Sequence, residues 1–405
     1  MISLIKNSNL RNIVMANLFS SVGRGMTLIG IAWYAVSKND MASPLGIIML
    51  ISTFLMLVLG PNVGIIIDRF PRKNILVLEN IIGSFVFLVF AIMDILSGTS
   101  YILLTIMYIS SMTLSQIHFP SQSALVQEIF SAHEYQKVNS TLEVQIQVTQ
   151  MLAGALAGIL LTNYDLNIVL FITAFTYLIA VIFSMQIQST KKTGASREGG
   201  RKKEHNNWWV DLSTGFNYLM QHKLLFFFGV SSFMPFIMLM VSNYLAPVYI
   251  KIGLQENVSV FSTAEFTYAI GAFLSGMLMM YIASKITPVN FLIINTALFA
   301  IVMIGMIMTS NKWSFIAFYG YLGWTVATTR LLSQTIFMKT VPQELMGRVI
   351  TSIDMIALVI RVIFIAIFTL SLDTIGARMG YVYLLILVLF SLLCFYQTRT
   401  IEQKN

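Results

Sequence analysis

The stretch Gly64–Lys73, GIIIDRFPRK, joins two long apolar runs, residues 44–67 and 74–96. Each run is long enough to cross a bilayer core of ~30 Å, which takes about 20 helical residues. The last five positions of the stretch hold three basic residues, and short basic loops stay on the cytoplasmic side of a membrane. The segment therefore predicts a tight cytoplasmic turn between two transmembrane helices.

The whole chain of 405 residues continues this pattern. Hydrophobic residues make up 57% and charged residues only 10%, whereas soluble domains carry about 25% charged residues. The predicted fold class is an all-α polytopic membrane protein with twelve transmembrane helices. Segmentation at charges, prolines and glycines gives the runs 12–36, 44–67, 74–96, 100–120, 141–162, 168–188, 222–249, 261–283, 289–309, 314–338, 351–372 and 380–397.

Basic residues between the runs are divided unevenly between the two sides of the membrane. Seventeen Lys and Arg fall on the side of both termini and of the polar stretch 190–211, and four fall on the other side. We expect a multi-pass protein of the cell membrane with both termini cytoplasmic. Since topology accounts for the net charge of +8, nucleic acid is not an expected partner.

An internal repeat accompanies the division into six plus six runs. Val138–Glu143, VNSTLE, matches Val349–Asp354, VITSID, at an offset of 211 residues. Two parallel six-helix halves would produce this offset. The predicted domains are an N-terminal bundle (1–189), a cytoplasmic linker (190–211) and a C-terminal bundle (212–405).

The sequence GIIIDRFPRK resembles the signature of the major facilitator superfamily, a glycine followed by Asp-Arg and two further basic residues between helices two and three. The resemblance implies a transporter that works by alternating access. Gly64 permits close helix approach, and Asp68 suits the positive N-terminus of another helix. The alternative is a positive-inside loop without a conformational role. The expected conformational switch comprises Gly64, Asp68, Arg69, Arg72 and Lys73, with Asp354 as an acidic partner for the basic residues.

Residues 120–140 and Val341–Val349 resemble the loops of the efflux branch that contains macrolide-efflux pumps and the enterobactin exporter. The resemblance implies that the direction is export. The arginine that drug exporters of this superfamily usually carry in span four is missing from Tyr108–Thr113, which puts their usual route of proton coupling in doubt. Their span-five antiporter motif survives only as the small-residue spacing of Gly154 and Gly158. This spacing favours close helix packing, with gating as the alternative.

Three arginines, Arg24, Arg330 and Arg361, lie inside predicted spans. An unpaired charge at the bilayer centre costs at least ~2.5 to 3.5 kcal/mol, so each arginine faces a cavity or a partner. They are candidate contacts for an anionic substrate, because a guanidinium holds a carboxylate through two parallel hydrogen bonds. Structural ion pairs are the alternative.

Acidic residues inside the spans are fewer. Glu265 is an isolated carboxylate within a span and is the first candidate for a proton carrier. Asp94, near the outer end of span three, is the second. The alternatives for Glu265 are a pair with Lys251 or a water-exposed position.

The sequence predicts a secondary active exporter, coupled to protons and monomeric, rather than an enzyme. We expect no cofactor and no metal site, because the single Cys394 and the four histidines form no ligand set. The favoured cargo is a small carboxylate-rich anion such as a siderophore, since three arginines against Glu265 would make a positive cavity. The alternatives are a macrolide-type or multidrug efflux pump and, in another class, a non-transporting receptor or lipid-modifying protein on the same fold.

Overall fold

The structure is a computed structural model that describes residues 7–131, 134–188, 208–283, 285–342 and 345–401. Helices and their short connections account for all of these residues, and no strand occurs among them. The predicted all-α fold class is confirmed.

Twelve long helices within the described residues correspond one for one to the twelve predicted apolar runs. Nine of them meet the length and hydropathy expected of a membrane span. The helices are α2 (Ser8–Ser37), α3 (Ser43–Arg69), α4 (Arg72–Ser97), α5 (Tyr101–Ile129), α6 (Tyr135–Asn163), α7 (Leu166–Met185), α9 (Lys223–Val248), α10 (Val258–Ala283), α11 (Pro288–Thr309), α12 (Lys312–Thr340), α13 (Met346–Ile375) and α14 (Ala377–Gln397).

Several helices, among them α3 and α5, run further than the sequence predicts. Helix α3 continues to Arg69, so the turn before α4 shrinks to Phe70 and Pro71. Helix α5 continues nine residues past Pro120, where the predicted span ends. Proline is tolerated inside membrane helices because neighbouring helices and polar side chains compensate for the backbone hydrogen bond that it removes. His118 therefore lies in the interior of α5 and not at a helix end, as the sequence suggested.

One helix was not predicted. Helix α8 (Trp208–Gln221) begins inside the predicted linker and has 14 residues, too few to cross a bilayer. It packs against α13, and Gly215 allows this approach because a Cβ there would overlap the backbone carbonyl of Arg348. Hydropathy segmentation overlooked α8 because its apolar positions are interrupted by polar residues.

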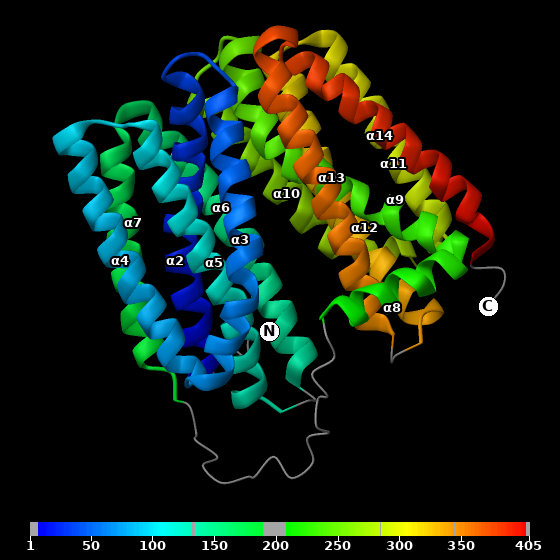
Figure 1. Cartoon of the computed structure of the whole chain (residues 1–405), viewed down its shortest axis with the longest axis horizontal. Coiled ribbons are helices and arrows are strands. Elements are labelled where there is room, and N and C mark those ends of the chain that lie inside the picture. Colours follow the sequence, from blue (N-terminus) through cyan, green and yellow to red (C-terminus); the bar gives the residue numbers. More distant parts are fainter. Residues whose placement is uncertain (1–6, 132–133, 189–207, 284, 343–344, 402–405) are drawn as a thin grey trace. The chain divides into compact units, whose positions relative to one another are not determined.

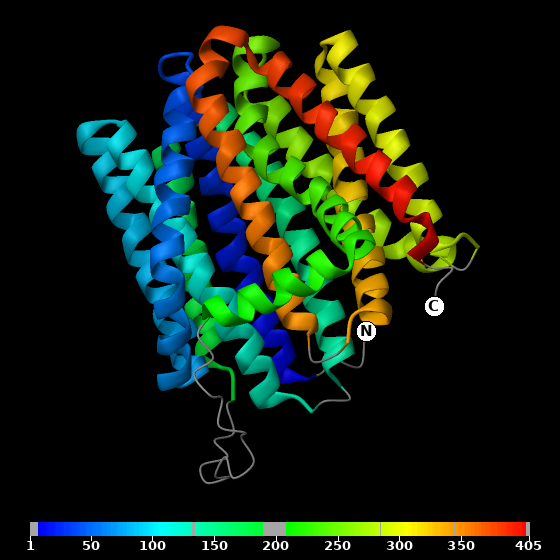
Figure 2. The same cartoon turned by 45° about the vertical axis from the view of Figure 1, so that its right-hand side comes forward.

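The first compact unit contains α2 to α7 together with the segment Pro247–Ala269. Helix α2 is its central element, because it packs against α3, α5, α6 and α7 (Figure 1). Helix α4 packs against α5 and α7, and both views show α4 and α7 side by side (Figures 1 and 2). A helix in the position of α2 presents polar side chains to several neighbours at once.

The second compact unit contains α8, α9 up to Ala246 and the chain from Ile270 onward. Helix α11 packs against α12 and α14, and α13 packs against α8 and α14. The offset of 211 residues noted in the sequence also separates the first residues of three helix pairs. These are Tyr101 and Lys312 (α5 and α12), Tyr135 and Met346 (α6 and α13), and Leu166 and Ala377 (α7 and α14).

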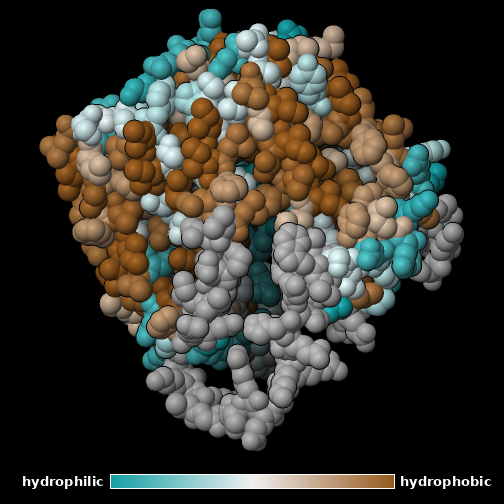
Figure 3. All heavy atoms as spheres, viewed as in Figure 1, coloured by the Kyte–Doolittle hydropathy of each residue, from teal (hydrophilic) through white to brown (hydrophobic). Residues whose placement is uncertain are grey.

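Large apolar side chains cover the outer flanks of the helices. Figure 3 shows them as brown surfaces along the helices, with hydrophilic residues gathered toward the helix ends. Leu96 and Leu370 are 80% and 86% exposed. Soluble monomers rarely expose contiguous apolar surface on this scale, so these flanks are suited to the hydrocarbon of a bilayer.

Candidate functional site

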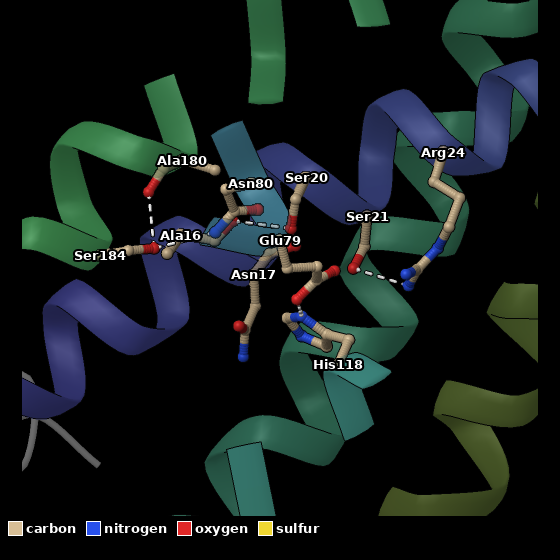
Figure 4. Close-up of polar contacts among 10 residues, drawn as sticks. All are labelled: Ala16, Asn17, Ser20, Ser21, Arg24, Glu79, Asn80, His118, Ala180 and Ser184. Atoms are coloured by element: carbon tan, nitrogen blue, oxygen red, sulfur yellow. Dashed lines mark hydrogen bonds and ion pairs between the residues drawn. The ribbon is translucent and has the colours of Figure 1, made fainter. Parts of the chain in front are cut away.

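A cluster of polar side chains from α2, α4, α5 and α7 lies inside the first unit (Figure 4). Buried polar groups are costly unless hydrogen bonds compensate, and in a bilayer no water compensates at the flanks. A cluster of this kind therefore marks the most polar interior of the unit. Its members are Asn17, Ser20, Ser21 and Arg24 on α2, Glu79 and Asn80 on α4, His118 on α5 and Ser184 on α7.

Two glycines fix the position of Arg24 on α2. A Cβ at Gly23 would overlap the hydroxyl of Thr176 on α7, and a Cβ at Gly25 would lie 2.7 Å from the Cβ of Ala153 on α6. Arg24 therefore stands between two close helix contacts. Its side chain is only 7% exposed.

Threonine hydroxyls join α2 to α7 beside this arginine. Thr173 donates to the carbonyl oxygen of Gly23 at 2.9 Å, and the hydroxyls of Thr27 and Thr173 lie 2.9 Å apart. Since the single hydroxyl proton of Thr173 goes to Gly23, Thr27 is the donor in the second bond. These bonds hold the backbone of α2 in place next to Arg24.

The guanidinium of Arg24 has neutral neighbours at close range. Its Nη2 donates to the hydroxyl oxygen of Ser21 at 3.3 Å, and its Cζ lies 5.8 Å from the ring centroid of Phe119, within cation–π range. The phenol of Tyr177 on α7 also interacts with it. Among the described residues, no carboxylate lies within the 4.0 Å of an ion pair.

Glu79 and His118 form a buried pair across α4 and α5. The Nδ1 of His118 lies 2.9 Å from the Oε2 of Glu79, and each residue is 3% exposed. The other carboxylate oxygen, Oε1, has no hydrogen-bond partner among the described residues. No role was predicted for either residue from the sequence, although each is a polar residue inside an apolar run.

One cavity touches both Arg24 and the buried pair. It measures about 170 Å³ and lies between α2, α5 and α6. Amide and hydroxyl side chains are six of its thirteen lining residues. The polar lining residues are Asn17, Ser21, Arg24, His118, Gln122, Gln145, Thr149 and Gln150.

The second unit holds two cavities that share Asp354. Arg330 and Asp354 line one of about 350 Å³, and Asp354 and Arg361 line another of about 310 Å³. Asp354 lies more than two turns inside α13, deeper than the helix end inferred from the sequence. The charge count taken from the sequence, three arginines against Glu265, was therefore too simple, because Glu79 and Asp354 also accompany the arginines.

The two predicted proton carriers lie apart from these cavities. Glu265 on α10 is half-buried, forms no ion pair within the described residues and is absent from the linings of all three cavities. Lys251 pairs instead with Asp40, at 3.8 Å. Asp94 accepts a hydrogen bond of 2.6 Å from Thr99 at the end of α4, a local contact that ties the following turn.

The small residues on α6 face α10 within the first unit. A Cβ at Gly158 would lie 2.8 Å from the Cβ of Ser262, and one at Gly154 would lie 3.1 Å from the carbonyl oxygen of Ser262. The two helices approach closely at these glycines. Whether the contact also gates transport stays a prediction.

The predicted switch is described only in part. Gly64, Asp68 and Arg69 belong to the helical backbone of α3, and their side chains lie outside the described residues. Arg72 and Lys73 are half-buried in the first turn of α4. The role of this motif stays a prediction.

A sequence profile of the Major Facilitator Superfamily matches residues 13–364. The chain belongs to this superfamily. Macrolide efflux protein A, from Streptococcus pyogenes, is 22% identical over 362 residues, which cover 86% of each protein. The MFS-type transporter YvqJ of Bacillus subtilis (strain 168) is 24% identical over 260 residues, covering 64% of this chain and 60% of YvqJ.

Solved structures of the superfamily share the fold. A bacterial homologue of the iron transporter ferroportin, in an inward-facing state, superposes with a TM-score of 0.74 at 14% identity, covering 96% of this chain and 98% of the homologue. The nucleoside transporter NupG superposes with a TM-score of 0.73 at 10% identity, covering 97% of this chain and all of NupG. At these identities the likeness shows the major facilitator fold alone. Membership and fold make this chain a multi-pass membrane transporter of small molecules.

Proposed function

We propose that this protein exports amphipathic organic compounds of the macrolide type by alternating access. The observation that carries the proposal is the position of Asp354, which lines the cavity of Arg330 and that of Arg361. Both cavities of the second unit thus contain the Asp354 carboxylate as well as an arginine cation. Such a lining accepts a cation, whereas an all-arginine lining would repel it.

The larger of these cavities has the mixed character that such a cargo requires. Phe233, Phe236 and Phe337 line it beside the charged residues. Ligand sites for organic molecules are mostly apolar with a few placed polar groups. The aromatic rings suit a lactone ring, and Asp354 suits the ammonium of an amino sugar. Similarity to macrolide efflux protein A over most of both chains supports the same cargo class and export as the direction.

A second candidate cargo is a carboxylate-rich anion such as a siderophore. The observation in its favour is Arg24, which lines an amide-rich cavity without an ion pair within the described residues. A guanidinium in that setting is a ready partner for a carboxylate. The presence of buried Glu79 in the same cluster weighs against this candidate, because it offsets the positive charge.

One comparison in cells separates the two candidates. Cells with and without the gene are loaded with radiolabelled erythromycin, and the medium of iron-limited cultures is assayed for a citrate-type siderophore. We expect cells with the gene to retain several-fold less erythromycin and to export no more siderophore. Siderophore export with unchanged erythromycin retention would replace the first candidate by the second. If neither compound moves, both cargo proposals are wrong.

A further inference from the structure

We propose that Glu79 and His118 form the proton-binding site of this transporter, and that the positive charge of a bound cargo favours release of the proton. The proposal rests on the proposed function for the cargo alone. The proton site itself is argued from contacts inside the first unit. It replaces Glu265, the carrier that the sequence favoured.

The geometry of the pair suits a proton held between two bases. The Nδ1 of His118 faces the Oε2 of Glu79 at 2.9 Å, and both side chains are 3% exposed. A buried carboxylate is costly as a bare anion, so the pair is stable when it shares one proton and is neutral overall. Histidine is the side chain whose charge ordinarily changes between pH 5 and 8, the range in which cells operate.

The pair also has an access route. His118 lines the cavity of about 170 Å³ that Arg24 lines from α2. A proton on the pair and a charged group in the cavity therefore act on each other over a short distance. Glu265, by contrast, is not among the residues that line this cavity.

The charged and titratable groups that face the pair come from two helices. From α2 comes Arg24, and from α7 comes Tyr177, whose phenol interacts with both Arg24 and Glu79. Helix α6 contributes the uncharged Gln145 and Thr149, which bond to each other at 2.8 Å. Arg24 is thus the one fixed cation among the described groups at this site.

The charges balance in a way that links proton release to cargo entry. With one proton on the pair, Arg24 carries the only net charge of the cluster. When a cationic cargo is bound, loss of that proton leaves the Glu79 carboxylate to offset Arg24, and the total, cargo included, stays at one positive charge. The cation then exchanges for the proton. An anionic cargo would have the opposite effect and would retain the proton.

The position of the pair in α5 provides a means of response. Pro120 follows His118 by two residues and removes the backbone hydrogen bond to the carbonyl of Gln116. The turn of α5 that contains His118 therefore lacks one backbone hydrogen bond. A change of charge at the pair alters the attraction between α4 and α5 at the point where α5 bends most easily.

The first test needs no cargo. Purified protein is titrated from pH 8 to pH 5, and the protons taken up are counted. We expect Glu79→Gln to take up about one proton fewer than the unmodified protein. Glu128→Gln, at an exposed carboxylate on α5, the helix of His118, is the matched control. Equal uptake by Glu79→Gln and Glu128→Gln would overturn the proton site.

The second test uses radiolabelled erythromycin as the probe in proteoliposomes. Exchange at equal pH requires binding and alternating access, whereas accumulation against a gradient also requires the proton. We expect Glu79→Gln and His118→Gln to lower accumulation at least tenfold more than they lower exchange. Glu128→Gln and His222→Gln, both at exposed positions, keep exchange and accumulation.

Accumulation that persists in both pair variants, or is lost in Glu265→Gln alone, would overturn the proposal. If Glu79→Gln does not insert into the membrane, His118→Gln carries the same test with the carboxylate in place. If the unmodified protein moves no erythromycin, the proposed cargo is wrong, and the titration still decides the proton site.

Discussion

Arg24 shows how a single residue combines the roles that the sequence left as alternatives. It is held between two close helix contacts and bonds to Ser21, yet it also lines a polar cavity. The phenol of Tyr177 interacts with both Arg24 and Glu79, and Glu79 belongs to the pair with His118. In this account its function is to compensate the carboxylate after the proton has left.

Substitution of Arg24 separates charge from geometry. We predict that Arg24→Lys keeps the rate of erythromycin efflux within about threefold, because an ammonium still offsets Glu79. Arg24→Ala should lower the rate at least tenfold, since proton release would leave an uncompensated buried anion. Initial efflux rates from loaded cells measure both variants. Equal rates for Arg24→Ala and the unmodified protein would remove Arg24 from the coupling.

Asp354 is predicted to recognise the positive charge of the cargo. Hydrogen bonds to charged groups contribute about 1.5 to 3 kcal/mol, or roughly ten- to a hundredfold in affinity. We expect Asp354→Asn to weaken binding of erythromycin by at least tenfold. Binding of an uncharged derivative that lacks the amino sugar should change less than threefold. Binding is measured by equilibrium dialysis, and an equal loss for the two compounds would mean that Asp354 acts on the structure and not on the cargo.

At the scale of the helices, the sequence was sufficient for the long apolar elements and insufficient for the polar exceptions. The twelve runs became helices because their length and hydropathy leave no other structure in a bilayer. Helix α8 and the extension of α5 past Pro120 were missed, because the rules that end a run at a charge or a proline ignore packing against neighbours.

The candidate site shows the same division. Arg24 with its flanking glycines stood out in the sequence, since a charge in an apolar run is conspicuous. The pairing of Glu79 with His118 did not, because it joins side chains on two helices 39 residues apart. Such a contact depends on which faces of α4 and α5 meet. The position of Asp354 in the cavity of Arg330 was missed for the same reason, since Arg330 lies on α12 and Asp354 on α13.

Gly23 is predicted to be essential for the contact between α2 and α7. A Cβ there would overlap Thr176, and overpacking of this kind costs about 1 to 3 kcal/mol. We expect Gly23→Ala to lower the unfolding temperature of the purified protein by several degrees. Gly276→Ala is the matched control, because nothing lies within 4 Å of a Cβ at that helical position. It should leave the temperature unchanged or raise it slightly. Equal temperatures for the two variants would show that α2 and α7 separate freely.

At the scale of the whole molecule, the uneven distribution of basic residues predicts the orientation. The ratio of seventeen basic residues to four predicts that the stretch 190–211 is cytoplasmic. In a variant with Cys394→Ser, we expect a cysteine at Ser196 to resist an impermeant thiol reagent in intact cells. A cysteine at Ser97, at the outer end of α4, should react. The reverse pattern would invert the topology and with it the direction of transport.

The central claim is that a cationic cargo leaves the cytoplasm in exchange for protons. Everted membrane vesicles with an acidic lumen and a trapped pH indicator test it directly when erythromycin is added outside. We predict that erythromycin enters and that luminal acidity falls faster in vesicles with the unmodified protein than in vesicles with Glu79→Gln. The Glu79→Gln vesicles control for the basicity of the drug itself. The same loss of acidity in both preparations, or a lumen that becomes more acidic as erythromycin enters, would contradict the account.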